Sequence, residues 1–182
     1  MINEIHNDIE SVFFTEEEIK ERVSKLGAEI SRDFDGKNPI FIGVLKGCWV
    51  FMADLMRSVS IPCAVDFMAV KSYSGTTSTG AVQIQKDLNE NIEGRHIIMV
   101  EDILDTGRTL KYLQDYLSAR NPASITIATL MDKPSRRQAP VSARYSCFEV
   151  PDAFVVGYGL DYNETYRNLP YIGVLKPEIY MD

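Results

Sequence analysis

The chain has 182 residues, of which 45% are hydrophobic and 25% are charged, a composition typical of a soluble globular protein with one domain over residues 1–182. Its net charge of −7 argues against broad binding of nucleic acid, and it has neither a run of eighteen apolar residues nor a basic-then-apolar leader, so we expect no membrane span and no secretory signal. Three widely spaced cysteines, Cys48, Cys63 and Cys147, argue against a disulfide framework and a zinc site, and they fit a reducing cytoplasm.

Helices and strands are expected to alternate along the chain. Residues 15–18 have the form of a capping box, and apolar residues then recur at spacings of three or four, which predicts an amphipathic helix over residues 15–34. In chain order the other expected elements are a strand at 40–45, a helix at 48–59, strands at 63–70 and 81–88, a strand, loop and helix within 97–119, a strand at 124–131, and a short strand group from residue 154. This alternation indicates an α/β fold with a doubly wound, mainly parallel sheet flanked by helices.

Several polar segments are expected to meet at one edge of that sheet. Ligands of doubly wound sheets bind beyond the carboxyl ends of the strands. Lys46, the pair Glu101-Asp102, Lys133 and residues 157–161 each follow a predicted strand. In addition, residues 72–80 contain two glycines and no apolar anchors, so we expect a flexible loop over about residues 71–81.

The most specific pattern in the chain lies between Ile97 and Leu110. An apolar run is followed by two carboxylates, Glu101 and Asp102, and then by a short polar loop that leads into a helix. Unpaired N–H groups and the dipole at a helix start attract an anion, most often phosphate, and Gly107 lets the backbone approach it. The two carboxylates suit sugar hydroxyls or Mg²⁺. The segment therefore predicts a sugar-phosphate site, although such residues can also simply cap a helix.

This segment resembles the phosphoribosyl pyrophosphate signature of the type I phosphoribosyltransferases, which is an apolar strand, Glu-Asp, two apolar residues, Asp-Thr-Gly, one variable residue and Thr. Further segments resemble the hypoxanthine(-guanine) branch of that family, in order from about residue 38 to 176: Val44-Leu-Lys-Gly47, Lys71-Ser-Tyr73, Leu130-Met-Asp-Lys133, Phe154 to Glu164, and Arg167. The resemblance implies the type I phosphoribosyltransferase fold, with a small base-binding hood built from N-terminal and C-terminal segments and a closing loop. It also implies purine salvage, in which Mg²⁺-dependent transfer of 5-phosphoribosyl to hypoxanthine or guanine yields IMP or GMP and pyrophosphate.

The resemblance also implies roles on the side of phosphoribosyl pyrophosphate. Asp105 is implied as the catalytic acid/base group at purine N7. The phosphate cradle would consist of Asp105, Thr106, Gly107, Arg108 and Thr109, of which Arg108 stands at the variable position. Glu101 and Asp102 would hold the ribose hydroxyls and Mg²⁺, and Asp161 would contact a second Mg²⁺. Pyrophosphate would be bound by Lys46, Gly47 and Arg167, beside a Leu45–Lys46 peptide that the family tends to strain.

For the base, the resemblance implies a purine site formed by Lys133, Phe154, Val155 and Asp161. Lys133 would donate to the exocyclic O6 and so select 6-oxopurines over adenine, whose 6-amino group is itself a donor. Phe154 would stack under the base. Ser72 and Tyr73 would close over the reacting carbon and exclude water. A homodimer or a homotetramer is the expected assembly.

Three alternatives remain at this point. The first is a phosphoribosyltransferase for another base. The segments around Lys133 and Phe154 argue against adenine, orotate and uracil, whereas xanthine, itself a 6-oxopurine, stays open beside hypoxanthine and guanine. The second is a regulator that keeps this fold and binds nucleic acid, which the net charge of −7 disfavours. The third is a generic Mg²⁺-dependent phosphotransferase, which would leave the C-terminal segments unexplained.

Overall fold

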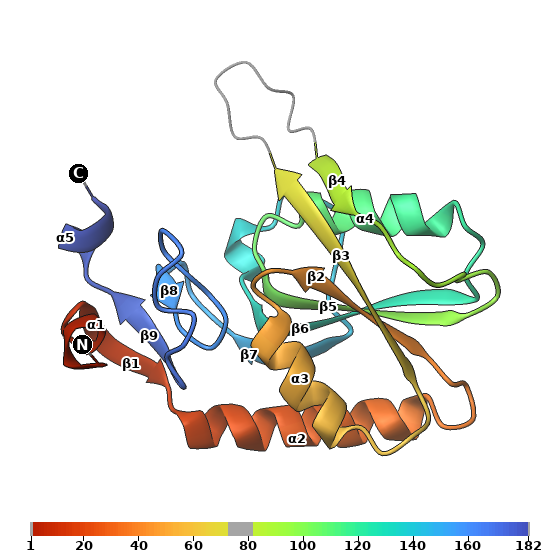
Figure 1. The fold of residues 1–182 in the computed structure, drawn as a ribbon, viewed down its shortest axis with the longest axis horizontal. Helices are drawn as coiled ribbons and strands as arrows, with labels where there is room; N and C mark the ends of the chain where they lie inside the picture. The colour runs from red at the N-terminus through yellow and green to blue at the C-terminus, as the bar shows by residue number, and fades with distance from the viewer. Residues whose placement is uncertain (1, 73–81, 182) are drawn as a thin grey trace.

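The computed structural model describes residues 2–72 and 82–181, and it folds them around a six-stranded sheet and a small three-stranded one (Figure 1). The elements in chain order are α1 (Ile2–Asn7), β1 (Ile9–Phe14), α2 (Glu16–Asp33), β2 (Ile40–Leu45), α3 (Trp49–Ser58), β3 (Ala64–Ser72), β4 (Val82–Lys86), β5 (His96–Leu104), α4 (Arg108–Ser118), β6 (Ser124–Asp132), a 3₁₀ turn η1 (Pro134–Arg136), β7 (Tyr145–Glu149), β8 (Val155–Val156), β9 (Ile172–Leu175) and α5 (Pro177–Tyr180).

The large sheet has the order β4-β3-β2-β5-β6-β7, and all its strand pairs are parallel except β3 with β4. The apolar run of β5 is buried on both faces of the sheet. Ile97 and Met99 pack into the core that α4 covers, whereas Ile98 and Val100 pack into the core of α2 and α3 (Figure 1). A strand that is buried on both faces needs a continuous apolar run. The predicted doubly wound, mainly parallel sheet is thus confirmed.

The two ends of the chain form the small sheet, in the order β1-β9-β8 (Figure 1). Its strands are antiparallel, and β8 and β9 cover a separate apolar cluster that consists of Val156, Tyr166, Leu169 and Leu175. This sheet lies where the resemblance expects the hood. The sequence patterns indicate a short strand group from residue 154, to which β8 and β9 belong, but they give no bounds for β9 and do not indicate β1, β7 or the two short terminal helices.

The predicted helix at residues 15–34 is confirmed as α2. Thr15 caps it, and the reciprocal bonds between Thr15 and Glu18 complete a capping box. The flexible loop expected over about residues 71–81 stays a prediction, because residues 73–81 lie outside the described residues. In the part of the chain that is described, no helix has the length and the apolar character needed to cross a bilayer.

The sequence places Glu101 and Asp102 after their strand, and this prediction is wrong in detail. Strand β5 continues through both residues to Leu104. The reason lies in the two neighbouring strands: pairing with β2 ends at Val100, whereas pairing with β6 continues to Leu104. The carboxylates therefore stand on a strand edge that β2 has left, and this gap is where the candidate site begins.

Candidate active site

The loop after β5 is shaped to approach a ligand through its backbone. Gly107 is the N-cap of α4 and adopts the left-handed conformation at φ 77°. Polar residues of this loop could instead have served to cap the helix, but Asp105 does not cap it. A Cβ atom at Gly107 would lie 2.6 Å from the Val141 side chain, so both conformation and space favour glycine. Gly107 has no side chain to cap the start of α4, and the Arg108 N–H makes a long hydrogen bond to Thr106 Oγ1 at 3.5 Å. The N–H groups that follow in the first turn are available to an anion.

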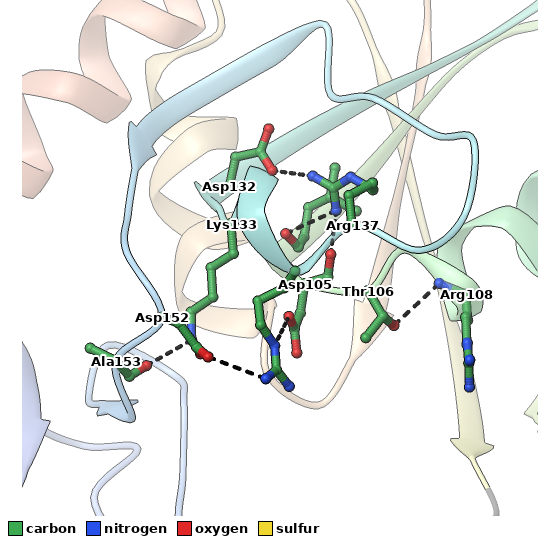
Figure 2. Close-up of polar contacts among 10 residues, drawn as sticks. Asp105, Thr106, Arg108, Asp132, Lys133, Arg137, Asp152 and Ala153 are labelled. Atoms are coloured by element: carbon green, nitrogen blue, oxygen red, sulfur yellow. Dashed lines mark hydrogen bonds and ion pairs between the residues drawn. The ribbon is translucent and has the colours of Figure 1, made fainter.

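Asp105 is joined to two other segments by arginines. Arg136 donates from Nε to Asp105 Oδ1 at 3.2 Å and from Nη1 to Asp152 Oδ2 at 3.2 Å. Arg137 donates to the backbone oxygen of Asp105 at 2.5 Å and also pairs with Asp132 (Figure 2). These arginines are functional candidates that the sequence does not single out. Their only signal is that they belong to a charged run directly after β6.

Lys133 lies beside this group and is 8% exposed. Its Nζ donates to the Ala153 oxygen at 2.7 Å and lies 3.7 Å from Asp152 Oδ1 (Figure 2). An ammonium group has three donors, and these contacts leave part of that capacity for a ligand. The buried stem and the fixed Nζ distinguish Lys133 from an ordinary surface lysine.

A cavity of about 470 Å³ unites the residues implied for base binding. It is lined by Ile103, Asp105, Lys133, Arg136, Asp152, Ala153, Phe154, Val155, Leu160 and Tyr180. Phe154 is 38% exposed, so part of this residue is open to a ligand at the cavity. Asp161 does not line this cavity, so the structure does not join it to the other three residues of the implied purine site.

Lys46 and Gly47 follow a cis peptide bond between Leu45 and Lys46. Gly47 packs directly against Asp102, because a Cβ on this glycine would lie 1.6 Å from Asp102 Oδ2. On its other side the loop contacts Gly159, whose own Cβ would lie 2.4 Å from the Gly47 oxygen. Through these close approaches the loop of Lys46 and Gly47 packs against Asp102 on one side and against Gly159 on the other.

Arg167 and Asp161 lie next to Gly159, beside the loop of Lys46 and Gly47. Arg167 donates to the Gly159 oxygen at 2.8 Å and pairs with Asp161 at 2.8 Å. Lys46 pairs with Glu164 at 3.0 Å, and both of these side chains are exposed. Arg167 also has a buried Nε without a hydrogen-bond partner in the described structure. The residues implied for pyrophosphate are thus together. The exposed pair of Lys46 with Glu164 costs little to exchange, whereas the pair of Arg167 with Asp161 is largely buried.

The carboxyl groups of Glu101 and Asp102 are buried close together on β5. Glu101 Oε2 is buried and has no hydrogen-bond partner among the described residues. Burial and then the charge of Asp102 raise the pKa of Glu101 well above its usual range, and burial raises the pKa of Asp102 to about 6. A bound cation would relieve both effects. No group of three metal-ligating side chains occurs in the described segments, so a cation here would need substrate oxygens as well, as is usual for Mg²⁺.

We expect Asp102→Asn to stabilise the ligand-free protein by about 1–3 kcal/mol near pH 7. The pKa of Asp102 is about 6 in the folded protein against an ordinary value of 3.8, so between these two values the folded state binds more protons than the unfolded chain. The free energy of unfolding therefore falls as pH rises through this window. Above the window, the folded protein bears the full loss of stability that comes from ionising the buried Asp102. Urea unfolding at a series of pH values measures the effect. Parallel profiles for the two proteins would contradict it.

A second cavity, of about 750 Å³, lies between α2, α3 and residues 158–170. Trp49, which is 50% exposed, and Arg57 are among its lining residues. Of the implied site residues it includes Arg167 alone. We therefore place the chemistry in the smaller cavity, where the carboxylate, the buried lysine and the exposed aromatic ring converge.

Comparisons with known proteins agree with this geometry. The family model described as "Phosphoribosyl transferase domain" matches residues 13–163. A hypoxanthine-guanine phosphoribosyltransferase of Streptococcus pneumoniae is 52% identical over 177 residues, which cover 97% of this chain and 98% of that protein. The crystal structure of a hypoxanthine phosphoribosyltransferase from Staphylococcus aureus superposes with a TM-score of 0.95 at 50% identity, covering 98% of this chain and 97% of that one. In Listeria monocytogenes, 28% of a bifunctional TilS/HprT protein aligns with 98% of this chain at 51% identity.

Proposed function

The chain belongs to the phosphoribosyltransferase family, and from this premise we propose that it transfers 5-phosphoribosyl from phosphoribosyl pyrophosphate to hypoxanthine and guanine, giving IMP or GMP and pyrophosphate. The observation that carries the proposal is the cavity that holds Asp105, Lys133 and Phe154 together. A carboxylate, a buried cation and a flat apolar surface are the groups that a 6-oxopurine needs.

On the base side, Phe154 is the stacking platform, and the backbone of Val155 contacts the edge of the ring. Lys133 donates to O6 from a position fixed by the Ala153 oxygen. Adenine would present its 6-amino donor to this ammonium group, and an unmatched pair of buried donors is costly. These contacts favour 6-oxopurines.

On the ribose side, the 5′-phosphate binds to residues 105–109 at the start of α4. Glu101 and Asp102 hold the ribose hydroxyls. Lys46, the N–H of Gly47 and Arg167 bind pyrophosphate, for which the ion pairs with Glu164 and Asp161 must be exchanged. Mg²⁺, held by the two β5 carboxylates with substrate oxygens and by Asp161 at pyrophosphate, would neutralise charge on the leaving group.

The chemical step forms a bond from purine N9 to C1 of the ribose and breaks the bond from C1 to pyrophosphate. Positive charge develops on the ribose, and it must be shielded from water. Asp105 accepts the proton that leaves purine N7, a task for which a positioned carboxylate is worth about 10²–10⁴-fold. Closure by Ser72 and Tyr73 remains a prediction, because Tyr73 lies outside the described residues and only the backbone of Ser72, at the end of β3, is described.

Turnover with hypoxanthine, guanine, xanthine and adenine, each with and without Mg²⁺, tests the proposal. We expect pyrophosphate release with hypoxanthine and guanine but not with adenine, and only when Mg²⁺ is present. Preferred turnover of adenine would assign the protein to another branch of the family. Salt-sensitive binding of nucleic acid without pyrophosphate release would favour the regulator instead. A cytoplasmic homodimer or homotetramer also belongs to this proposal, and light scattering would measure its size.

We expect Lys133→Ala to lower kcat/KM for hypoxanthine and guanine by about 10–100-fold, since a hydrogen bond from a charged group is lost. The KM for phosphoribosyl pyrophosphate should stay within about twofold of the parent value. Steady-state kinetics measures both constants. Lys25→Ala, which removes an exposed lysine of α2, is the control. Equal losses for the base and for phosphoribosyl pyrophosphate would show that Lys133 is only structural.

A further inference from the structure

Phe154 does not stand alone at the cavity. The ring of Tyr180 stacks on it with centroids 4.5 Å apart and an interplanar angle of 17°. The ring of Tyr162 meets it almost at a right angle, at 85° and 5.6 Å. One face of Phe154 is therefore covered by an aromatic partner, while 38% of the residue stays exposed. Tyr180 lines the same cavity as Phe154, but neither tyrosine has been given a role so far.

Both ends of the chain fix the position of Tyr180. It lies on α5, directly after β9, and β9 pairs with β8 and with β1 (Figure 1). Leu175 donates its N–H to the Phe154 oxygen at 3.0 Å, and Lys176 donates its N–H to the Asp8 oxygen at 2.9 Å. Tyr180 itself packs against the apolar cluster of the small sheet. The backbones that carry Phe154 and Tyr180 are thus hydrogen-bonded to each other.

We propose that Tyr180 is a positioning residue for the purine, which supports one face of the Phe154 ring so that the other face receives the base. The inference rests on the proposed function, since it assumes that Phe154 is the base platform. A phenylalanine with a large exposed area would otherwise be free to change rotamer. Parallel stacking on an anchored ring restricts the plane of Phe154, and the purine must match that plane to stack on it. Part of the base affinity then comes from a residue that stacks on the platform.

The ring of Tyr180 should matter, and its hydroxyl should not. No hydrogen bond of this hydroxyl is present in the described structure, whereas the hydroxyls of Tyr158 and Tyr166 bind Asp54 and Asp8. Tyr180→Phe keeps the flat surface and is therefore expected to behave like the parent. Tyr180→Leu keeps apolar bulk against the small sheet but removes the flat surface, so it guards against a simple loss of folding in Tyr180→Ala.

Steady-state kinetics and calorimetry with IMP and with ribose 5-phosphate test the proposal. Tyr180→Ala and Tyr180→Leu should raise the KM for hypoxanthine by about three- to tenfold, as expected for one aromatic pair, with kcat and the KM for phosphoribosyl pyrophosphate nearly unchanged. Affinity for IMP should fall by a similar factor, whereas affinity for ribose 5-phosphate, which has no base, should not. Tyr180→Phe and Met181→Ala, which alters an exposed neighbour, should match the parent.

Three results would overturn the inference. They are an unchanged KM for hypoxanthine in both variants, a lower KM, which would mean that Tyr180 competes with the base, and equal weakening of IMP and ribose 5-phosphate. Phe154→Ala separates this inference from the proposed function. If Phe154→Ala raises the KM for hypoxanthine and the Tyr180 variants do not, only the inference fails. If Phe154→Ala has no effect, the base platform itself is wrong.

Discussion

Asp105→Asn is expected to lower kcat by about 10²–10⁴-fold while the protein continues to bind phosphoribosyl pyrophosphate. The amide has nearly the shape of the carboxylate but cannot take the proton from purine N7. Asp105 lines the cavity together with Lys133, so it lies where the base is expected. Single-turnover kinetics with titration of phosphoribosyl pyrophosphate separates the chemical step from binding.

The matched control is Asp152→Asn. Arg136 contacts Asp105 and Asp152 at the same distance, 3.2 Å, and all three side chains are about half exposed. Both substitutions therefore remove one ion pair of Arg136, but only Asp105→Asn removes the proposed proton acceptor. Asp152→Asn also removes the 3.7 Å contact of Asp152 with Lys133, so the comparison is made on kcat and not on the KM for the base. We expect Asp152→Asn to retain kcat within about threefold, because exposed pairs contribute little. Similar losses of kcat in the two variants would mean that the pairing of Arg136, and not proton transfer, matters at Asp105.

Local patterns in the sequence predict the strands and helices of the large sheet well, except for its edge strand β7. Long apolar runs such as Ile97 to Val100 must be buried on both faces. A capping box such as that of α2 marks the residue at which the helix begins. The small sheet gives weaker signals. Strand β1 has mixed burial and two register shifts against β9, so its residues do not alternate cleanly. Its pairing joins the two ends of the chain, and a local pattern contains no information about such a partner.

The candidate site also contains residues that a local pattern indicates and residues that only the fold brings together. Residues 101–109 and Lys133 could be proposed because the motif is continuous and each part lies at or just after the end of an apolar run. Arg136 and Tyr180 could not, since their roles depend on contacts with Asp105 and Phe154 that are formed only by the fold. The error over Asp102 has the same origin. A strand continues for as long as one neighbour pairs with it, and here β6 is longer than β2.

Gly47→Ala is expected to lower kcat/KM for phosphoribosyl pyrophosphate by about 100-fold or more, because misplacement by about 1 Å in an active site can cost that much. The new Cβ would lie 1.6 Å from Asp102 Oδ2, far inside van der Waals contact. The loop cannot easily move away, since the Gly47 oxygen already contacts Gly159. Asp102 would have to move instead, although its Oδ1 accepts the Ile103 N–H at 2.7 Å. Either movement displaces a group proposed to hold the ribose or pyrophosphate.

Gly94→Ala is the control for the general cost of replacing a glycine. Gly94 has φ 67° and no atom within 4 Å of the added Cβ, so that variant should lose about 1 kcal/mol of stability and keep its activity. Thermal unfolding and calorimetry with phosphoribosyl pyrophosphate compare the two variants. If Gly47→Ala binds this substrate as tightly as the parent, the loop and Asp102 can separate without loss. The contact between them would then be a matter of packing, and pyrophosphate would have to be bound without a fixed Gly47 N–H.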